Sequence, residues 1–391
     1  MTAAELHPRA PAGAPSDPRA PAGARSELRA PAGARPGLRA VLLGTGIAAG
    51  SNQVDNTMLS RVIETDDAWV RERSGIATRF YVDAGVGSSD LGAEAARAAL
   101  ADAGIAASEL DYIVCATMTP DHYFPGAGTL LQDKIGAPPL PVLDIRQQCA
   151  GFAYGLQMVD ALVRSGIART VLLVGCDVHS CLMPYSAQTW EVLYGRDPGP
   201  LPAEDFTWNS KFRHLLVLFG DAAGAMVFRA EENDGARGIL GSELYGDGAQ
   251  KQILFVPGAG SARRPWVDAA MIAAAETVPV MEGRQVFKLA VTRMPEVTTS
   301  LLKRHGYTLA DLDLLVMHQA NLRINEAAQK ALGLPDEKVH NNIQRYGNTT
   351  SATLPLCFHE ARQAGKAKPG SLVALTALGA GLHWGSVLLR I

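Results

Sequence analysis

The 391-residue sequence has few cysteines, no cluster of positive charge and no long apolar run. Its five cysteines are odd in number and widely spaced, without a CxxC pair or neighbouring histidines, which argues against a disulfide framework or a zinc site and favours a reduced, cytoplasmic protein. A net charge of −3 without a basic run argues against a nucleic-acid partner. No stretch reaches transmembrane length, so we expect no membrane segment. The cysteines are Cys115, Cys149, Cys176, Cys181 and Cys357.

Hydrophobic residues make up 47% of the chain and charged residues 19%, which is enough apolar material for a large core of two domains or two lobes. Residues 1–37 differ from the rest, because Arg-Ala-Pro-Ala-Gly-Ala recurs there at positions 9, 19 and 29. Such a segment cannot bury a core, and we predict a disordered tail. It has no apolar region typical of a secretory signal. A transit peptide is the weaker alternative, since the prolines oppose an amphipathic helix.

The ordered part repeats itself at low resolution. An amphipathic helix at 90–103 precedes an apolar segment at 108–115, and a second helix at 286–304 precedes a similar segment at 310–317, 202 residues later. Similar elements in the same order at a near-constant offset indicate a duplicated α/β unit. Apolar strands that alternate with helices favour a largely parallel sheet covered by helices.

Three polar residues, Cys149, His318 and Asn348, stand in apolar surroundings. Cys149 follows a short apolar strand and precedes a helix expected from Ala150 to about Ser165. The positive end of a helix favours thiolate over thiol, and thiolate is the nucleophile. A cysteine with a histidine and an asparagine elsewhere is a candidate nucleophilic site, and the duplication would bring all three to one centre. Taken singly, each residue could instead be a core or turn residue.

The motifs around these residues resemble those of thiolase-superfamily condensing enzymes, most closely β-ketoacyl-acyl-carrier-protein synthase III. They are Cys-Ala-Gly-Phe from Cys149, His-Gln-Ala-Asn from His318 and Gly-Asn-Thr-Thr-Ser-Ala from Gly347. The resemblance covers almost everything from Leu38 to the C-terminus. Further matches lie at 67–76, 219–225, 281–288 and 384–386.

The resemblance implies a thiolase-like α/β fold. Two pseudo-symmetric halves would stack in α-β-α-β-α layers, with the nucleophilic cysteine in residues 38–230 and the catalytic histidine and asparagine in residues 231–391.

The resemblance also implies an acyltransferase. Cys149 would take an acyl group from a thioester, and a malonyl- or β-ketoacyl-carrier-protein thioester would then condense with it. His318 and Asn348 would stabilise the enolate, and backbone N–H groups of Cys149 and Ala380 would form the oxyanion hole. No metal or cofactor is implied, since acyl-CoA and acyl-carrier-protein thioesters are the substrates.

Other positions carry implied roles in substrate binding and assembly. Trp69 and Arg73 would hold the nucleotide of coenzyme A. Phe124 would reach across a homodimer interface and limit the acyl pocket. The basic residues expected to receive the acyl carrier protein are Lys288, Arg323 and Lys330.

Three features depart from the family pattern. Ala380 replaces a glycine in the turn 379–381, and its side chain restricts φ. His383 is either an added acid–base group or a packed side chain, and packing is favoured. An insertion at about 182–215, rich in aromatic residues, could line an acyl or aryl pocket or form a dimer contact.

The insertion also suggests a member from specialised metabolism, and other functions stay open. The chain could be a ketosynthase that joins two carrier-bound chains into a resorcinol or cyclohexanedione ring. It could be an acyltransferase that acts without decarboxylation. A non-catalytic partner subunit is disfavoured, because such a subunit would not need Cys149, His318 and Asn348 together.

Overall fold

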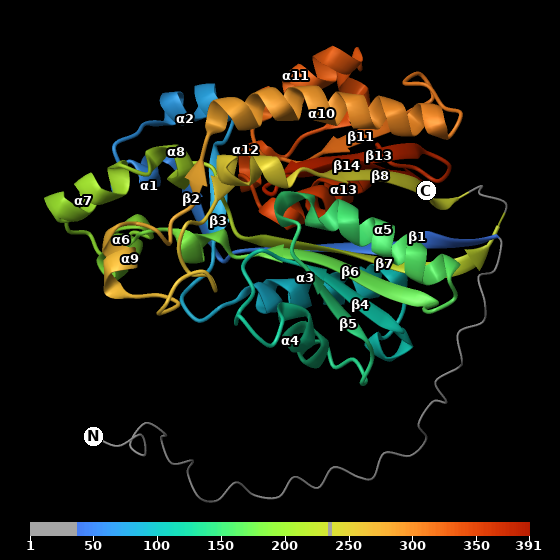
Figure 1. The fold of residues 1–391 in the computed structure, drawn as a ribbon, viewed down its shortest axis with the longest axis horizontal. Helices are drawn as coiled ribbons and strands as arrows, with labels where there is room; N and C mark the ends of the chain where they lie inside the picture. Colours follow the sequence, from blue (N-terminus) through green and yellow to red (C-terminus); the bar gives the residue numbers. More distant parts are fainter. Residues whose placement is uncertain (1–36, 234–236) are drawn as a thin grey trace, which may run out of the picture.

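Two five-stranded sheets, each covered by helices on both faces, form the framework of the molecule (Figure 1). The computed structural model describes residues 37–233 and 237–391, so the predicted tail lies outside the described residues apart from Gly37. The first sheet has the order β1 (Leu38–Ala49), β7 (Ala222–Glu232), β6 (Thr170–Asp177), β4 (Tyr112–Ala116), β5 (Val142–Ile145). The second has the order β8 (Gly238–Gly246), β14 (His383–Arg390), β13 (Leu372–Gly379), β11 (Leu314–Met317), β12 (Val339–His340).

Helices fill the space between the sheets and cover their outer faces, which gives the five expected layers (Figure 1). The layer between the sheets holds α5 (Gly151–Arg164) and α13 (Thr353–Gln363). The outer face of the first sheet carries α3 (Ser88–Ala103) and α4 (Ala127–Lys134). The outer face of the second carries α10 (Gly283–Arg304) and α11 (Leu322–Leu332).

Shorter elements extend from one end of these layers. Two small antiparallel sheets pair β2 (Asn52–Asp55) with β3 (Thr78–Tyr81) and β9 (Leu254–Phe255) with β10 (Val280–Met281). The short helices are α1 (Asn56–Leu59), α2 (Asp67–Ser74), α6 (Ala187–Leu193), α7 (Ala203–Ser210), α8 (Arg213–Leu216), α9 (Ala269–Ala273) and α12 (Ile343–Tyr346). Three of the 3₁₀ turns bear on the site: η2 (Gln148–Ala150), η3 (His179–Leu182) and η6 (Thr350–Ala352).

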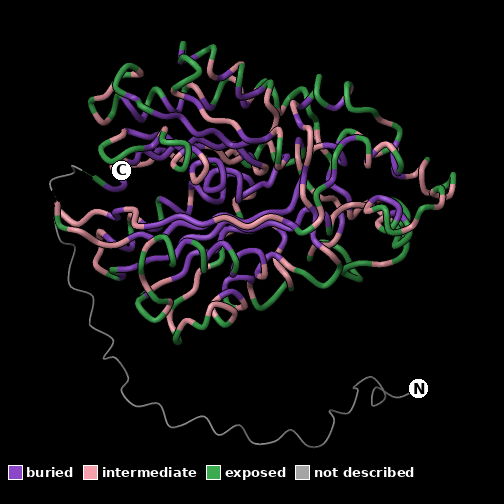
Figure 2. The backbone as a smooth tube through the Cα atoms, turned by 180° about the vertical axis from the view of Figure 1, so that it is seen from behind, coloured by how far each residue is buried: buried purple, intermediate pink, exposed green. Residues whose placement is uncertain are grey.

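The sheets are mixed, and one strand in each runs against the other four, which refines the expectation of a largely parallel sheet. β6, β4 and β5 run parallel, β7 runs against them, and β1, which pairs antiparallel with β7, runs in their direction again. The second sheet repeats this arrangement, with β14 as its reversed strand. All eight residues of β6 and of β13 are buried. Because helices cover both faces of each sheet, antiparallel strands here need the same apolar runs as parallel ones. Figure 2 shows the buried backbone concentrated in the strands and in the layer between them.

The duplication is confirmed by the topology. The two sheets have the same strand order, and β11 and β13 begin 202 residues after β4 and β6. β7 ends at Glu232 and β8 begins at Gly238, close to the expected division between 230 and 231. Within the described residues, no helix is both long enough and apolar enough to cross a bilayer.

The first half depends on a close contact between α3 and β1. Gly46 lies in β1 directly beneath the helix, and a Cβ atom at this position would lie 2.3 Å from the carbonyl oxygen of Ala95 and from the amide nitrogen of Ala99. Both are backbone atoms that cannot rotate away. The helix can therefore approach the strand only where the strand carries no side chain.

We expect Gly46→Ala to lower the free energy of unfolding by about 1–3 kcal/mol, because the added methyl group forces α3 away from β1. Thermal unfolding followed by circular dichroism measures the effect. Gly248→Ala is the matched control, since a Cβ atom there meets nothing within 4 Å. Equal melting temperatures for the two variants would show that the helix adapts without cost.

Candidate active site

Cys149, His318 and Asn348 line one pocket, although they lie far apart in the sequence. Cys149 belongs to η2 between β5 and α5, His318 follows β11, and Asn348 lies between α12 and η6. The pocket has a volume of about 130 Å³. The rest of its wall is largely apolar and includes Phe219, Met281, Val286, Phe287, Ala290 and Met294.

A backbone turn in the left-handed region precedes each of the two central helices. Gln148 has φ of +50° and Thr350, 202 residues later, has φ of +51°. Residues other than glycine adopt this conformation at a cost, and such strain gathers at functional sites. In each case two residues separate the left-handed residue from the start of α5 or α13, and Cys149 and Ser351 are the first of these two, so they occupy equivalent positions.

The end of β13 packs against the backbone of Cys149. A Cβ atom on Gly379 would lie 2.9 Å from the Cys149 nitrogen and 2.8 Å from the Ala150 nitrogen, so only glycine fits here. Ala380 is not among the described residues with positive φ, so the turn does not require from it the left-handed conformation that favours glycine. The turn from residue 379 to 381 therefore lies beside the amide of Cys149 despite the departure from three glycines.

The carboxylate of Asp177 links the two halves of the molecule through hydrogen bonds. Asp177 ends β6 and is fully buried. Oδ1 accepts hydrogen bonds from the hydroxyls of Thr117 and Thr119, each at 3.0 Å. Oδ2 accepts from the Ser351 amide at 3.0 Å and from the hydroxyls of Ser351 and Thr350. One side chain therefore connects the loop after β4 in the first half to η6 in the second.

The thiol of Cys149 is less acidic than its position before a helix suggests. Only 6% of Cys149 is exposed. Burial, with a smaller contribution from the negative charge of Asp177, raises its pKa to about 12. The expectation that the helix N-terminus favours thiolate is therefore wrong for Cys149, because removal from water outweighs the helix dipole.

His318 is buried and neutral. Burial lowers its pKa to about 3, so the ring carries a single N–H at physiological pH. Its Nδ1 lies 2.7 Å from Oγ1 of Thr353, the first residue of α13. Asn348 is also fixed, because its Oδ1 accepts a hydrogen bond from the Thr350 amide at 2.9 Å. This bond leaves the amide nitrogen of Asn348 as the group that can donate into the pocket.

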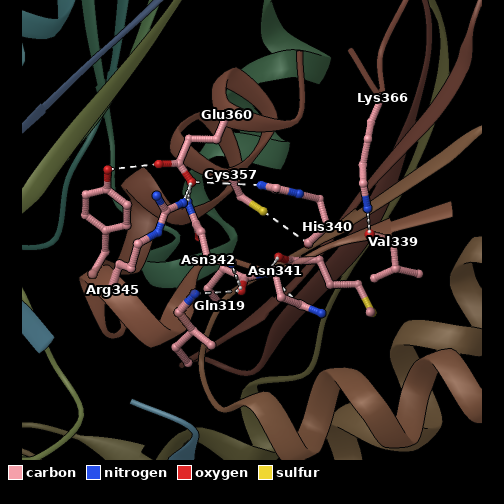
Figure 3. A network of polar contacts seen from close by, with 12 residues as sticks. Gln319, Val339, His340, Asn341, Asn342, Arg345, Cys357, Glu360 and Lys366 are labelled. Carbon is pink, nitrogen blue, oxygen red and sulfur yellow. Dashed lines mark hydrogen bonds and ion pairs between the residues drawn. The ribbon is translucent and has the colours of Figure 1, made fainter. Parts of the chain in front are cut away.

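A second polar network holds the segments that carry His318 and Asn348 (Figure 3). Oε1 of Gln319 accepts hydrogen bonds from the amides of Asn342 and Ile343 at 3.2 and 3.3 Å. Glu360 of α13 accepts a hydrogen bond from the Asn342 side chain at 2.9 Å. The same carboxylate forms an ion pair with Arg345 at 2.5 Å. Sequence reasoning missed these residues, although Gln319 lies within the motif that contains His318.

Trp69 and Arg73 lie on α2 at one side of the pocket. The side-chain amide of Asn321, which lines the pocket, donates to the carbonyl of Arg73 at 2.9 Å. The guanidinium of Arg73 lies 4.6 Å from the Trp69 ring, and that of Arg213 lies 4.4 Å from it. Arg213 was not predicted, because it lies 144 residues after Trp69 in the sequence and only the fold brings the two together.

The other predicted positions lie on the surface. Lys288 on α10 and Arg323 and Lys330 on α11 are all exposed, and these two helices also carry part of the pocket wall. Phe124 is 82% exposed and lies beside Tyr123, whose ring packs 4.4 Å from that of Trp266.

The segment 182–215, predicted to be an insertion, forms α6, α7 and most of α8. Trp190 and Tyr194 pack with Tyr81 into an apolar cluster of their own. None of the described residues from 182 to 215 lines the pocket of Cys149. The structure thus gives no support to an acyl pocket built by this segment, and a dimer contact stays a prediction.

His383 packs away from that pocket. Its ring lies 5.6 Å from that of Tyr154 in an edge-on contact, and Nδ1 is 3.5 Å from the Tyr154 hydroxyl. Partial burial lowers its pKa. These contacts support the packed alternative over an added acid–base group.

Two family models match the chain. Residues 143–197 match the model of 3-oxoacyl-[acyl-carrier-protein (ACP)] synthase III, and residues 302–391 match the model of its C-terminal part. Two curated proteins named β-ketoacyl-[acyl-carrier-protein] synthase III are similar over 90% of this chain and 99% of their own length. The protein from Granulibacter bethesdensis is 40% identical over 354 residues, and that from Rhodospirillum rubrum is 39% identical over 358 residues.

Solved structures agree with these matches. The 3-oxoacyl-[acyl-carrier-protein] synthase III from Aquifex aeolicus is 33% identical, with a TM-score of 0.76 over 90% of this chain and 100% of that one. The priming β-ketosynthase from the R1128 polyketide biosynthetic pathway is 27% identical, with a TM-score of 0.77 over 93% of this chain and 98% of that one.

The high pKa of Cys149 predicts how its alkylation depends on pH. The rate of iodoacetamide labelling at Cys149 should rise about tenfold per pH unit between pH 7 and 9.5, because the thiolate is the minor form throughout this range. Peptide mapping by mass spectrometry follows the site, and Cys149→Ser corrects for labelling of the exposed Cys181. A rate that levels off near pH 7 would instead reveal the acidic thiol predicted from the sequence.

Proposed function

Because the chain belongs to the β-ketoacyl-acyl-carrier-protein synthase III family of condensing acyltransferases in fatty-acid and polyketide biosynthesis, we propose that Cys149 carries the acyl group, which then condenses with a malonyl thioester on acyl carrier protein. The observation that carries this proposal is the meeting of Cys149, His318 and Asn348 in one largely apolar pocket. Cysteine supplies the nucleophile, and the other two supply neutral hydrogen-bond donors.

The first half-reaction loads the acyl group. The sulfur of Cys149 attacks the thioester carbonyl, the bond to the departing thiol breaks, and the proton of Cys149 leaves with that thiol. The tetrahedral oxyanion would accept hydrogen bonds from the backbone N–H groups of Cys149 and Ala380. The close packing of Gly379 on Cys149 supports this arrangement, since it holds the turn beside the nucleophile.

The second half-reaction forms the carbon–carbon bond. The malonyl thioester loses carbon dioxide, and its thioester oxygen becomes an enolate that accepts hydrogen bonds from His318 and Asn348. The enolate carbon attacks the acyl carbonyl, and the sulfur of Cys149 leaves and takes a proton from solvent. The high pKa of Cys149 favours this return to the thiol.

Coenzyme A would enter beside α2. Trp69 offers a flat face for the nucleotide base, while Arg73 and Arg213 offer positive charge for base or phosphate. The Asn321 amide that lines the pocket also binds the carbonyl of Arg73, so the nucleotide site would lie at the pocket entrance.

A homodimer would cover the aromatic surface formed by Tyr123, Phe124 and Trp266. An exposed aromatic surface of this kind is typical of an interaction site. In the dimer, Phe124 of one copy would limit the acyl pocket of the other, which follows from its position in the family motif.

His318→Ala and Asn348→Ala should abolish condensation but leave acylation of Cys149 largely intact. Loss of one oxyanion donor typically costs roughly 10²–10³ in rate, and both side chains are proposed to act on the enolate of the second substrate. Intact-protein mass spectrometry measures loading, and carbon dioxide release measures condensation. Cys149→Ala, which cannot be loaded, is the control.

Wild-type rates of condensation in both variants would contradict the decarboxylating reaction and favour an acyltransferase that acts without it.

The exposed cations on α10 and α11 would receive the acidic carrier protein. Lys288→Glu should raise KM for the carrier-bound thioester, because the reversed charge repels the carrier, and should leave KM for a short coenzyme A thioester unchanged. Lys303→Glu is the matched control, since it changes the same charge at the exposed far end of the same helix. If both variants raise KM equally, net charge rather than a docking surface explains the effect.

A further inference from the structure

Asn348 can donate to the enolate only if the nitrogen of its side-chain amide, and not the oxygen, faces the pocket. The two ends of the amide have nearly the same shape, so packing alone does not choose between them. If the amide is turned by half a rotation, its oxygen meets the developing negative charge and repels it. The orientation therefore has to come from a neighbouring group that can pair with only one of the two ends.

The backbone N–H of Thr350 is such a group. It lies 2.9 Å from Oδ1 of Asn348, and a backbone N–H can donate but never accept. Thr350 is fully buried, so in the turned form its N–H would face a second donor, with no water to replace the lost bond. No described residue accepts a hydrogen bond from Nδ2 of Asn348, which leaves this nitrogen available to the pocket that Asn348 lines.

Thr350 presents this N–H from a left-handed conformation, with φ of +51°. A β-branched residue seldom adopts this conformation, because its side chain crowds the backbone there. The angle φ sets how the side chain of Thr350 lies relative to the peptide group that carries its N–H. If the side chain is held in place, a change of φ therefore turns the N–H away from Oδ1 of Asn348.

The carboxylate of Asp177 holds that side chain. The hydroxyl of Thr350 donates to Oδ2 of Asp177. The amide and the hydroxyl of Ser351 donate to the same oxygen, so three donors from two consecutive residues converge on one atom. Hydrogen bonds to a buried carboxylate are stronger than those between neutral groups, and they can offset the strain of the left-handed residue.

The other half of the molecule has an equivalent turn with a different neighbour. Gln148 adopts φ of +50°, yet the residue that ends β13, as Asp177 ends β6, is Gly379. Gln148 is unbranched at Cβ, and its left-handed conformation forms without a carboxylate at that place. An aspartate there is thus no requirement of the fold, and it occurs at the turn whose N–H orients Asn348.

We propose that Asp177 is a positioning residue that holds Thr350 in its left-handed conformation, so that the N–H of Thr350 keeps Nδ2 of Asn348 directed at the enolate. This role rests on the proposed function of Asn348 as an enolate donor. Asp177 is not among the described residues that line the pocket, so it acts through Asn348 and not on the substrate.

The variants Thr350→Ala and Thr350→Gly separate this role from packing. Both remove the hydroxyl, but glycine adopts the left-handed conformation freely and alanine does not. We expect Thr350→Ala to lower kcat of condensation by a factor approaching the roughly 10²–10³ of a lost oxyanion donor, with little change in KM. Thr350→Gly should lose less than Thr350→Ala, although it removes more of the side chain. Thr350→Ser keeps the hydroxyl and should retain most of the wild-type kcat.

Asp177→Asn tests the carboxylate directly. It keeps the shape of the side chain but loses the charge and one accepting oxygen, so condensation should fall as it does in Thr350→Ala. A second substitution, Thr350→Gly, should recover part of the lost kcat, because glycine does not need the carboxylate. In an Asn348→Ala background, Thr350→Ala should cause no further loss, because the residues act as one unit. Intact-protein mass spectrometry should show that Cys149 is still loaded in each variant.

Crystal structures of the wild type, Thr350→Ala and Thr350→Gly measure the conformation without reference to activity. The wild type and the glycine variant should keep residue 350 in the left-handed region and its N–H in contact with Oδ1 of Asn348. The alanine variant should lose both features.

Three results would overturn the proposal. The first is a loss of kcat in Thr350→Gly that equals or exceeds the loss in Thr350→Ala. The second is an alanine variant that keeps the left-handed residue and its contact with Asn348. The third is an Asp177→Asn variant that Thr350→Gly does not rescue, which would assign Asp177 to folding alone.

Two further outcomes are decided by the remaining measurements. If Asn348→Ala condenses at the wild-type rate, the proposed function fails, and the crystal structures still show whether the hydroxyl of Thr350 sets the conformation. If Asp177→Asn does not fold, the alanine and glycine variants of Thr350 decide the question alone.

Discussion

The buried carboxylate of Asp177 is the interaction on which the site depends. Hydrogen bonds from Thr117 and Thr119 hold it to the first half, and those from Thr350 and Ser351 hold it to the second. A charge removed from water is tolerated only when donors surround it, so the two halves can close only in a register that supplies them. The hydrogen bonds to Thr350 and Ser351 also fix the position of Asn348, because Asn348 precedes them in the same turn.

Much of this arrangement could be predicted from the sequence. The duplication and the meeting of Cys149, His318 and Asn348 follow from strand and helix ends at a constant offset, because equivalent ends of equivalent units lie at one place. The reversed direction of β7 and β14 could not be predicted, since burial on both faces gives parallel and antiparallel strands the same composition. The contact of Arg213 with Trp69 depends on how the segment 182–215 folds, and no local sequence pattern shows that.

The protonation state of the Cys149 thiol was harder to predict than the position of Cys149 in the fold. The sequence shows that Cys149 precedes a helix, but it does not show how little of the side chain reaches water. Cys149 and His318 are both uncharged in the resting enzyme, one because burial raises its pKa and the other because burial lowers it. The negative charge of the enolate therefore arises from the substrate, and neutral hydrogen-bond donors of the pocket stabilise it. Neither Cys149 nor His318 has to lose a charge before catalysis.

The equivalence of Cys149 and Ser351 has a consequence for how the two halves can change. Both residues follow a left-handed turn and precede a central helix, yet the Ser351 hydroxyl is committed to Asp177 and to the carbonyl of Ala116 at 2.9 Å. Because the two positions belong to one chain and not to two identical copies, a substitution at one leaves the other unchanged. The position of Cys149 can therefore vary for reactivity while Ser351 keeps the contact that holds the halves together.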